Sequence, residues 1–218
     1  CLDVVKGAPC PVKTLGFSDS SNIRILDVET STDGSHFTLE GTRYYVPMIG
    51  EFNIRNAAMA IAAAQFAGLN VKQLADSMGR FEGVARRQEV KGVVNGISVV
   101  DDFAHHPTEL TAVLTSAVRM GYHEVWAVFQ PHTYSRTYNL LEDFAKALSI
   151  PHHLVMTEIL AVREENKWGI HTSDLAAKVP GSVWFDSFEK IADYVMEHAQ
   201  PGDLILTLGG GDIYKCAN

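Results

Sequence analysis

Residues 96–129 read GISVVDDFAHHPTELTAVLTSAVRMGYHEVWAVF, and this stretch decides the fold of the second half of the chain. It begins and ends with short apolar runs, GISVV (96–100) and EVWAVF (124–129), which are typical of buried strands. Between these runs, apolar residues recur at the spacing of one helical face: Leu110, Val113, Leu114, Ala117 and Val118. A strand, a helix and a second strand in this order predict one unit of a parallel sheet.

The same alternation continues towards the end of the chain. Two more helices and three more strands are expected: a helix over 140–148, strands at HLVMT (153–157), SVWF (182–185) and DLILTL (203–208), and a helix over 188–198. The last helix is preceded by Asp186-x-x-Glu189, which is similar to a capping box. Apolar strands alternating with amphipathic helices predict a mostly parallel, Rossmann-like α/β domain over residues 92–218.

Residues 1–91 carry a different pattern. Runs rich in β-branched and aromatic residues predict four strands: PVKTLGF (11–17), NIRILDVET (22–30), HFTLEG (36–41) and TRYYVPM (42–48). An alanine-rich helix is expected over 53–67, ended by Gly68, and a shorter helix over 71–78. The alanines suggest close packing of the first helix. The fold class is therefore α/β, in two regions.

Composition excludes several classes of protein. The net charge of −8 argues against a nucleic-acid partner, because binding phosphates needs an excess of Lys and Arg. No apolar run reaches the roughly 18 residues that span a membrane, and no secretory signal is present. Cys1, Cys10 and Cys216 have no CxxC spacing, which favours reduced thiols over a disulfide framework. We expect a soluble cytoplasmic protein without a membrane partner; its oligomeric state has no signature here.

The segment DDFAHHPTE, residues 101–109, directly follows the strand GISVV. Ligands of such sheets bind beyond the carboxyl ends of the strands. Pro107 suits the first turn of a helix, and so does Glu109. A loop with a helix cap would explain these two residues, but not the two adjacent pairs of titratable groups: Asp101, Asp102, His105 and His106. Because crowding titratable groups is costly unless they meet a ligand or each other, we interpret the segment as part of an active site.

Two further segments follow strands at the same predicted edge. QPHTYSRT (130–137) contains Arg136, whose guanidinium suits a carboxylate or phosphate; alternatively Ser135 or Thr137 caps a helix and Arg136 is merely solvated. The glycines of LGGGD (208–212) favour a tight turn over a nucleotide motif, because neither a GxxxxGK[ST] nor a GxGxxG pattern occurs.

Other candidates lie in or near the first region. Arg86 and Arg87 could bind a phosphate near an interdomain hinge, or could simply be solvated. Asn53 and Asn56 stand at the start of the alanine-rich helix, where Asn53 could be the N-cap.

Together these segments resemble the Mur ligase family, the ATP-dependent enzymes that build the stem peptide of peptidoglycan. GEFNIRNAAMAIAAA (50–64) is similar to a helix start of that family, FEGVARRQEV (81–90) to its hinge, and DDFAHHPTE to its D-D-Y-A/G-H-H-P-T-E segment. FQPHTYSRT, REEN (163–166) and GDLILTLGGGDI (202–213) follow in the right order, so the resemblance covers nearly the whole chain.

The double histidine, QPH-x-Y-x-R-T and GGGDI are most similar to the members that join L-alanine to UDP-N-acetylmuramate. GEFN and DDFAHHPT are also similar to the members that attach recycled murein tripeptide, whereas QPHTYSRT favours the alanine-adding type. Two residues depart from the family pattern, Phe52 in place of His and Phe103 in place of Tyr.

The resemblance implies two sets of site residues. Near ATP it places Asn53 and Asn56 by the adenine, Asp102 by the ribose, and Arg86 or Arg87 by the phosphates. It places three catalytic residues so that they face the amino acid and the reacting carboxylate: His105, His106 and Arg136. His132 and Tyr134 are weaker candidates for binding the substrate. Arg136 would pair with the alanine carboxylate.

The resemblance also implies what is missing. The family has an N-terminal UDP-sugar domain and a central domain that opens with a P-loop, and neither occurs here. Residues 1–91 would be the end of the central ATP-binding domain, and 92–218 the C-terminal domain. Mg²⁺ is expected, with its main ligands in the missing part. We predict that the chain alone does not ligate L-alanine to UDP-N-acetylmuramate.

Two alternatives remain open at this point. A metal-dependent hydrolase could use as ligands the residues Asp101, Asp102, His105 and His106, although adjacent histidines are poorly spaced for chelation. The chain could also be a non-catalytic module that binds nucleotide or the rest of a ligase.

Overall fold

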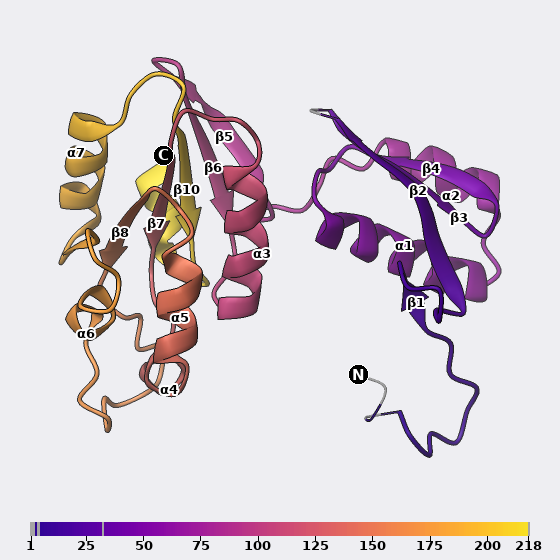
Figure 1. Ribbon diagram of the computed structural model, residues 1–218, viewed down its shortest axis with the longest axis horizontal. Helices are drawn as coiled ribbons and strands as arrows, with labels where there is room; N and C mark the ends of the chain where they lie inside the picture. Colours follow the sequence, from indigo (N-terminus) through magenta and orange to yellow (C-terminus); the bar gives the residue numbers. More distant parts are fainter. Residues whose placement is uncertain (1–2, 4, 32, 218) are drawn as a thin grey trace. The chain divides into compact units, whose positions relative to one another are not determined.

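The computed structural model describes residues 3, 5–31 and 33–217. Its contacts divide the chain into two compact units, Cys1–Gly83 and Val84–Asn218, each with its own sheet (Figure 1). Cys1 lies outside the described residues, and Cys10 and Cys216 are free thiols. In the described part of the chain, no helix has the length and apolar character needed to cross a membrane.

The first unit consists of a four-stranded sheet and two helices. The strands lie in the order β1 (Leu15–Gly16), β2 (Ile23–Ser31), β3 (Gly34–Leu39) and β4 (Thr42–Val46). The first pair is parallel and the other two pairs are antiparallel. Helices α1 (Glu51–Phe66) and α2 (Val71–Gly79) follow. The four predicted strands and both predicted helices are confirmed.

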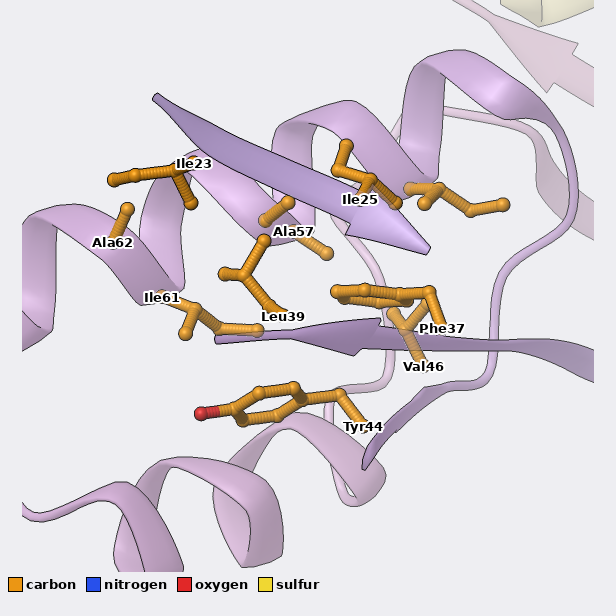
Figure 2. Packing of buried hydrophobic residues seen from close by; sticks show 11 residues of the cluster. Ile23, Ile25, Phe37, Leu39, Tyr44, Val46, Ala57, Ile61 and Ala62 are labelled. Carbon is orange, nitrogen blue, oxygen red and sulfur yellow. The ribbon is translucent and has the colours of Figure 1, made fainter. Parts of the chain in front are cut away.

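One face of α1 forms the core of the first unit together with the sheet (Figure 2). Ala57, Ile61 and Ala62 from the helix join Phe37 and Leu39 from β3 in one buried cluster. The alanines let the helix lie close to the strands, because they add almost no side-chain bulk. The packing that the alanine-rich sequence suggested is therefore present on this face.

The start of α1 differs from the expectation. The helix begins at Glu51 with Gly50 as its N-cap residue, whose φ of 100° suits glycine. Asn53 therefore lies inside the first turn and is not the N-cap. It is buried, and its amide donates to the carbonyl oxygen of Ile49 at 2.8 Å.

The second unit is a six-stranded sheet. Its strands lie in the order β5 (Glu89–Val94), β6 (Ile97–Asp102), β10 (Leu204–Leu208), β7 (Val125–Phe129), β8 (His153–Thr157) and β9 (Val183–Phe185). Only β5 is antiparallel to its neighbour; the other pairs are parallel. The predicted strands and the mostly parallel sheet are confirmed.

Helices cover both faces of this sheet. The helices are α3 (Pro107–Val118), α4 (Tyr134–Asn139), α5 (Leu141–Leu148), α6 (Thr172–Ala176) and α7 (Phe188–His198), followed by the 3₁₀ helix η1 (Asp212–Ala217). Phe129 of β7 meets Phe144 of α5, whereas Val128 joins a buried cluster with Ile191 of α7. Because successive side chains of a strand point to opposite faces, α5 and α7 lie on opposite sides of the sheet.

The two units divide at Gly83 and Val84, earlier than the boundary expected at residue 92. The reason is β5, which the sequence analysis did not predict and which pairs with β6 as an edge strand. Residues 84–91 therefore belong with the second sheet. Short elements such as α6 and η1 were also not predicted, because they hold too few residues to show a period.

The predicted capping box before α7 is wrong by one residue. The N-cap is Ser187, whose hydroxyl accepts from the backbone N–H of Lys190. Asp186 instead forms an ion pair with the side chain of Lys190 at 2.7 Å.

Candidate functional site

The candidate site lies at the carboxyl edge of the second sheet. Three segments meet there because β6, β10 and β7 are parallel neighbours that end side by side: residues 101–106, 209–211 and 130–136. A fourth segment, the loop after β8, joins them through a bridge between His132 and Leu160. The three segments that the sequence marked as unusual are therefore brought together by sheet order.

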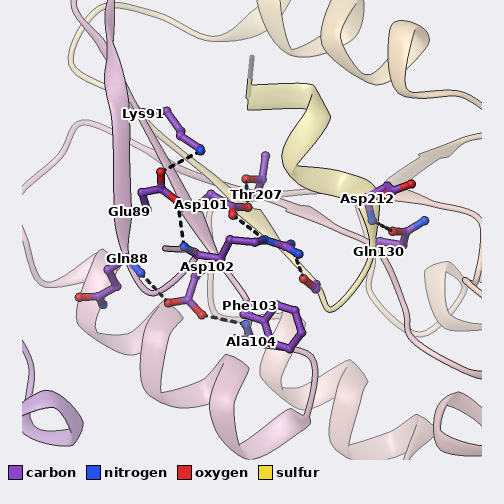
Figure 3. Close-up of polar contacts among 12 residues, drawn as sticks. Gln88, Glu89, Lys91, Asp101, Asp102, Phe103, Ala104, Gln130, Thr207 and Asp212 are labelled. Atoms are coloured by element: carbon purple, nitrogen blue, oxygen red, sulfur yellow. Dashed lines mark hydrogen bonds and ion pairs between the residues drawn. The ribbon is translucent and has the colours of Figure 1, made fainter. Parts of the chain in front are cut away.

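Asp101 is fully buried at this edge and is held by a cation and a hydroxyl (Figure 3). Its carboxylate accepts from Thr207 Oγ1 at 2.7 Å and from Arg86 Nε at 2.9 Å. Arg86 also donates to the carbonyl oxygen of Gly209 at 2.8 Å, and its guanidinium lies 4.9 Å from the ring centre of Phe103. Arg86 therefore ties the segment before β5 to the ends of β6 and β10.

Asp102 is only 2% exposed and binds backbone N–H groups. One of its oxygens accepts from Gln88 N at 2.9 Å and the other from Ala104 N at 2.8 Å (Figure 3). Burial raises the pKa of Asp102, against the lowering effect of these two hydrogen bonds. The carboxylate thus holds the loop after β6 in place. A ligand could bind it only by donating to the lone pairs that are not used in these two bonds.

Arg87 has different surroundings from its neighbour Arg86. It is exposed and lies 5.5 Å from the ring centre of Phe103. Among the described residues it forms no ion pair within 4.0 Å. Of the two arginines proposed for phosphate binding, Arg87 is therefore the one whose guanidinium is available.

His105 and His106 form different hydrogen bonds although they are adjacent in the chain. The Nδ1 atom of His105 lies 2.8 Å from the carbonyl oxygen of Phe103 and 3.6 Å from Glu109 Oε2. His106 is the N-cap of α3, and its Nδ1 accepts from the backbone N–H of Thr108 at 3.3 Å. Pro107 is the first residue of α3, as predicted, and Glu109 completes a capping box by accepting from the backbone N–H of His106.

His132 lies beside His105 and against the glycine segment. The ring centres of the two histidines are 5.4 Å apart, and a Cβ atom added to Gly210 would lie 3.2 Å from His132. Burial lowers the pKa of His132, and its electrostatic interactions with His105 and Arg136 add to this effect. Its Nδ1 is buried and has no hydrogen-bond partner among residues 3, 5–31 and 33–217. His132 is therefore held as a neutral ring.

The glycines of 209–211 are required by close approach. A Cβ atom on Gly211 would lie 2.4 Å from Gln130 Oε1, which already accepts from the backbone N–H of Asp212. Gly209 has a φ of 147°, which other residues rarely adopt, and its carbonyl oxygen accepts from Arg86. The chain bends at these glycines, and the absence of a side chain leaves the two histidine rings room beside Gly210.

Arg136 lies in the first turn of α4, and Thr133 caps this helix in place of the predicted Ser135 or Thr137. The Thr133 hydroxyl accepts from the backbone N–H of Arg136. The guanidinium of Arg136 lies 3.5 Å from the backbone oxygen of His105, so it faces the loop after β6. Tyr134 is the first residue of α4 and is half-buried.

Glu164 lies beside the candidate site and was not among the predicted residues. Ser135 donates to it twice, from its hydroxyl at 2.5 Å and from its backbone N–H at 2.8 Å. These bonds lower the pKa of Glu164, and the charge of Arg136 adds to the effect. The REEN stretch was the available signal, but its contact with Ser135 spans 29 positions of the chain and has no local pattern.

Backbone strain occurs in the two loops that meet at α4. Thr133 has a φ of 66° and Val162 a φ of 59°, and both side chains are β-branched. Positive φ in β-branched residues costs on the order of 1–3 kcal/mol and is concentrated at functional sites. The bonds between Ser135 and Glu164 hold these loops together.

The described residues do not support the metal site of the hydrolase alternative. Within residues 3, 5–31 and 33–217, one group of three possible ligands occurs, and it contains none of the expected residues: His123, Glu124 and Asp203. This group precedes β7 and β10 and so lies at the opposite edge of the sheet. Asp203 there already accepts from His123, from Trp126 Nε1 and from two backbone N–H groups.

The remaining candidates, Asn53 and Asn56, belong to the first unit. Asn53 is buried and Asn56 is exposed on α1. Phe52, which departs from the family pattern, is half-buried beside them.

The sequence was compared with known proteins and protein families. Residues 86–211 match the family model for the glutamate ligase domain of Mur ligases. The UDP-N-acetylmuramate–L-alanine ligase of Acetivibrio thermocellus is 36% identical over 225 residues, covering 98% of this chain and 48% of that protein. The ligase of the same name from Lachnospira eligens is 42% identical over 170 residues, covering 76% and 37%.

Solved structures show the same fold. The UDP-N-acetylmuramate-alanine ligase of Thermotoga maritima has a TM-score of 0.74 at 22% identity, covering 94% of this chain and 46% of that one. A murein peptide ligase of Psychrobacter arcticus has a TM-score of 0.72 at 25% identity, covering 99% and 47%. The chain spans about half the length of the curated relatives it matches. It belongs to the Mur ligase family.

Proposed function

We propose that the chain supplies the carboxyl-terminal part of a cytoplasmic, ATP-dependent ligase that joins L-alanine to UDP-N-acetylmuramate in peptidoglycan synthesis. The observation that carries the proposal is the grouping at one sheet edge of His105 and His132, whose rings lie beside Gly210, with Arg136, which contacts the backbone oxygen of His105. Relatives at 33–42% identity that are named for L-alanine favour this amino acid over murein tripeptide.

The acceptor side of the site suits a small amino acid. Arg136 presents a planar cation that can pair with a carboxylate in two parallel hydrogen bonds. Glu164 binds Ser135 at the start of α4 and thereby holds the backbone next to Arg136 in place. We propose that Arg136 binds the alanine carboxylate, with His132 and Tyr134 bordering the amino acid. His106, for which the resemblance implies the same place, caps α3.

The reaction needs activation of the carboxylate of UDP-N-acetylmuramate, because an amine does not displace oxide from a carboxylate. ATP converts this carboxylate to an acyl phosphate, which the amine attacks with loss of phosphate. The protein contributes mainly position and positive charge to such steps. In this chain Arg87 and Arg136 offer that charge at the carboxyl edge.

On the nucleotide side we propose Arg87 as the phosphate contact, because Arg86 is committed to Asp101 and Gly209. Asp102 remains the proposed ribose contact, and Asn53 and Asn56 the adenine contacts. The carboxylates at this edge do not fit a Mg²⁺ site, since Asp101 and Asp102 are buried and bound to protein donors. We propose that Mg²⁺ is bound by the remainder of the ligase.

The proposal is tested by calorimetric titration of L-alanine into the whole chain and into Arg136→Ala. We expect binding to the wild type and at least a tenfold loss in the variant, because a charge-assisted bidentate pair is lost. Arg119→Ala is the matched control, since Arg119 is exposed at the far end of α3. Equal affinity in Arg136→Ala, or preference for murein tripeptide over alanine, would contradict the proposal.

A second measurement concerns the chain as a catalyst. We expect no ATP-dependent alanine ligation by the chain alone, because a P-loop is absent from its 218 residues. Product formation detected by mass spectrometry would contradict this expectation.

A further inference from the structure

His105 is held in one tautomer by its surroundings. Its Nδ1 lies 2.8 Å from the carbonyl oxygen of Phe103 and 3.6 Å from Glu109 Oε2, and both oxygens can only accept. The hydrogen must therefore be on Nδ1. In the neutral ring the lone pair is then on Nε2.

His106 is held in the opposite tautomer. Its Nδ1 accepts from the backbone N–H of Thr108 as part of the α3 capping box, so Nδ1 must be unprotonated. In the neutral ring the hydrogen is then on Nε2. Two adjacent, chemically identical side chains are thus fixed in different tautomers, His105 by the carbonyl oxygen of Phe103 and His106 by the first turn of α3.

We propose that His105 is the proton acceptor for the incoming amine, through Nε2, and that His106 is a positioning residue that caps α3. The proposal rests on the proposed function, because it needs an amino acid bound at Arg136. The guanidinium of Arg136 lies next to the backbone of His105. In an α-amino acid the ammonium nitrogen is two bonds from the carboxylate carbon, and the proposal places this nitrogen beside the His105 ring.

The proton transfer and the bond changes balance. The ammonium group of L-alanine gives one proton to Nε2 of His105 and becomes a neutral amine. The amine lone pair forms the C–N bond at the carbonyl carbon of the acyl phosphate, and the bond from that carbon to the phosphate oxygen breaks. Phosphate leaves with the bonding electrons and takes the extra proton from nitrogen, and the His105 imidazolium returns its proton to water.

Two charged side chains lie next to His105. The carboxylate of Glu109 lies on the Nδ1 side, with its Oε2 3.6 Å from that nitrogen. The guanidinium of Arg136 lies 3.5 Å from the backbone oxygen of His105. His132, whose pKa is lowered, adds no positive charge at neutral pH, and Gly210 leaves the space between the two rings open.

The experiment uses long-range ¹H–¹⁵N correlation spectra of the histidine rings in the whole chain. His198 is the internal reference, because its Nδ1 lies 2.8 Å from the carbonyl oxygen of Tyr194, far along the chain on α7. We expect Nδ1–H tautomers for His105 and His198, and an Nε2–H tautomer for His106. Adding L-alanine at neutral pH should shift Nε2 of His105 and leave His198 unchanged, and Arg136→Ala should abolish the shift.

The outcomes separate this inference from the proposed function. An Nε2–H tautomer at His105, or an alanine response at His106 in its place, overturns the inference. If alanine shifts the ring of His132 but not that of His105, the proposed function stands and the proton-acceptor role falls. If neither ring responds, both proposals fall.

Discussion

Arg86 and Arg87 have the same side chain, but they differ in burial and in ion pairing. Arg86 is paired with Asp101, which is fully buried, whereas Arg87 is exposed beside Phe103. Removing one partner of a buried pair leaves an uncompensated charge, which costs about 3–5 kcal/mol. We therefore expect substitution of Arg86 to lower the stability of the fold, and substitution of Arg87, the proposed phosphate contact, to leave stability nearly unchanged.

His123 makes the stability of the second unit depend on pH. The hydrogen bond to Asp203 raises the pKa of His123, and burial opposes this effect without cancelling it. A raised pKa in the folded state stabilises the protein below the unfolded value of about 6.5, and this contribution is lost as pH rises through the folded pKa. We expect His123→Gln to lower the thermal midpoint at pH 5.5, with a smaller difference at pH 8.5.

The pKa of Asp203 is shifted in the opposite direction, so its contribution to stability depends on pH in the opposite way. Burial raises its pKa, but hydrogen bonds from Gln200, His123 and Trp126 outweigh this and lower it overall. Its contribution is present above the unfolded pKa of about 3.9 and is lost on further acidification. The two effects do not overlap, so a difference between wild type and His123→Gln that grows from pH 5.5 to 8.5 would contradict the assignment.

At the scale of elements, the start of α3 does two things at once. His106 satisfies an otherwise unpaired N–H group of the first turn, and Glu109 accepts from the backbone of His105 and His106. The same turn fixes the tautomer of His106, whereas that of His105 is set by the carbonyl oxygen of Phe103, with Glu109 of the turn 3.6 Å away. The cap therefore also fixes the state of one ring at the candidate site.

This double use gives a prediction for His106. Replacing it by Ala removes the cap and should cost about 1 kcal/mol, within a range of 0.5–2, whereas Ser is a better N-cap and should keep the stability. Urea denaturation of the two variants measures the difference. Equal losses in His106→Ala and His106→Ser would show that the ring, and not its role as cap, stabilises the helix.

At the scale of the whole molecule, the boundary between units decides which pieces can fold. A chain covering 84–218 keeps β5, Arg86 and the ion pair to Asp101. A chain covering 92–218 loses Arg86 and half of β5, and leaves Asp101 buried beside Thr207.

We expect 84–218 to unfold cooperatively on heating, because its sheet and buried clusters are complete within the unit. The shorter piece should be less stable by about 3–5 kcal/mol, or fail to fold. Circular dichroism and urea titration of both pieces provide the measurement, and 84–218 with Arg86→Ala is the control for the ion pair. Equal stability of the two pieces would contradict the role given to Arg86.

Most elements were predictable because their signals are local. The apolar runs of β6, β7, β8 and β10 and the periodic helices α3 and α7 show the sheet and its carboxyl edge directly. β5 was not predicted, because an edge strand is half exposed and Gly92 interrupts its pattern with a bulge. The candidate segments 101–109 and 130–137 were also predictable, since they follow strong strand signals.

The sequence by itself determined the α/β class, the strands that end together, and the segments that meet at that edge. Three features were decided only by the tertiary structure. Arg86 and not Arg87 is bound to Asp101, His105 and not His106 carries its lone pair on Nε2, and Glu164 binds the start of α4. The physical reason is separation along the chain. Arg86 bonds to Gly209 across 123 positions, and Ser135 to Glu164 across 29, so neither contact leaves a local pattern in the residues themselves.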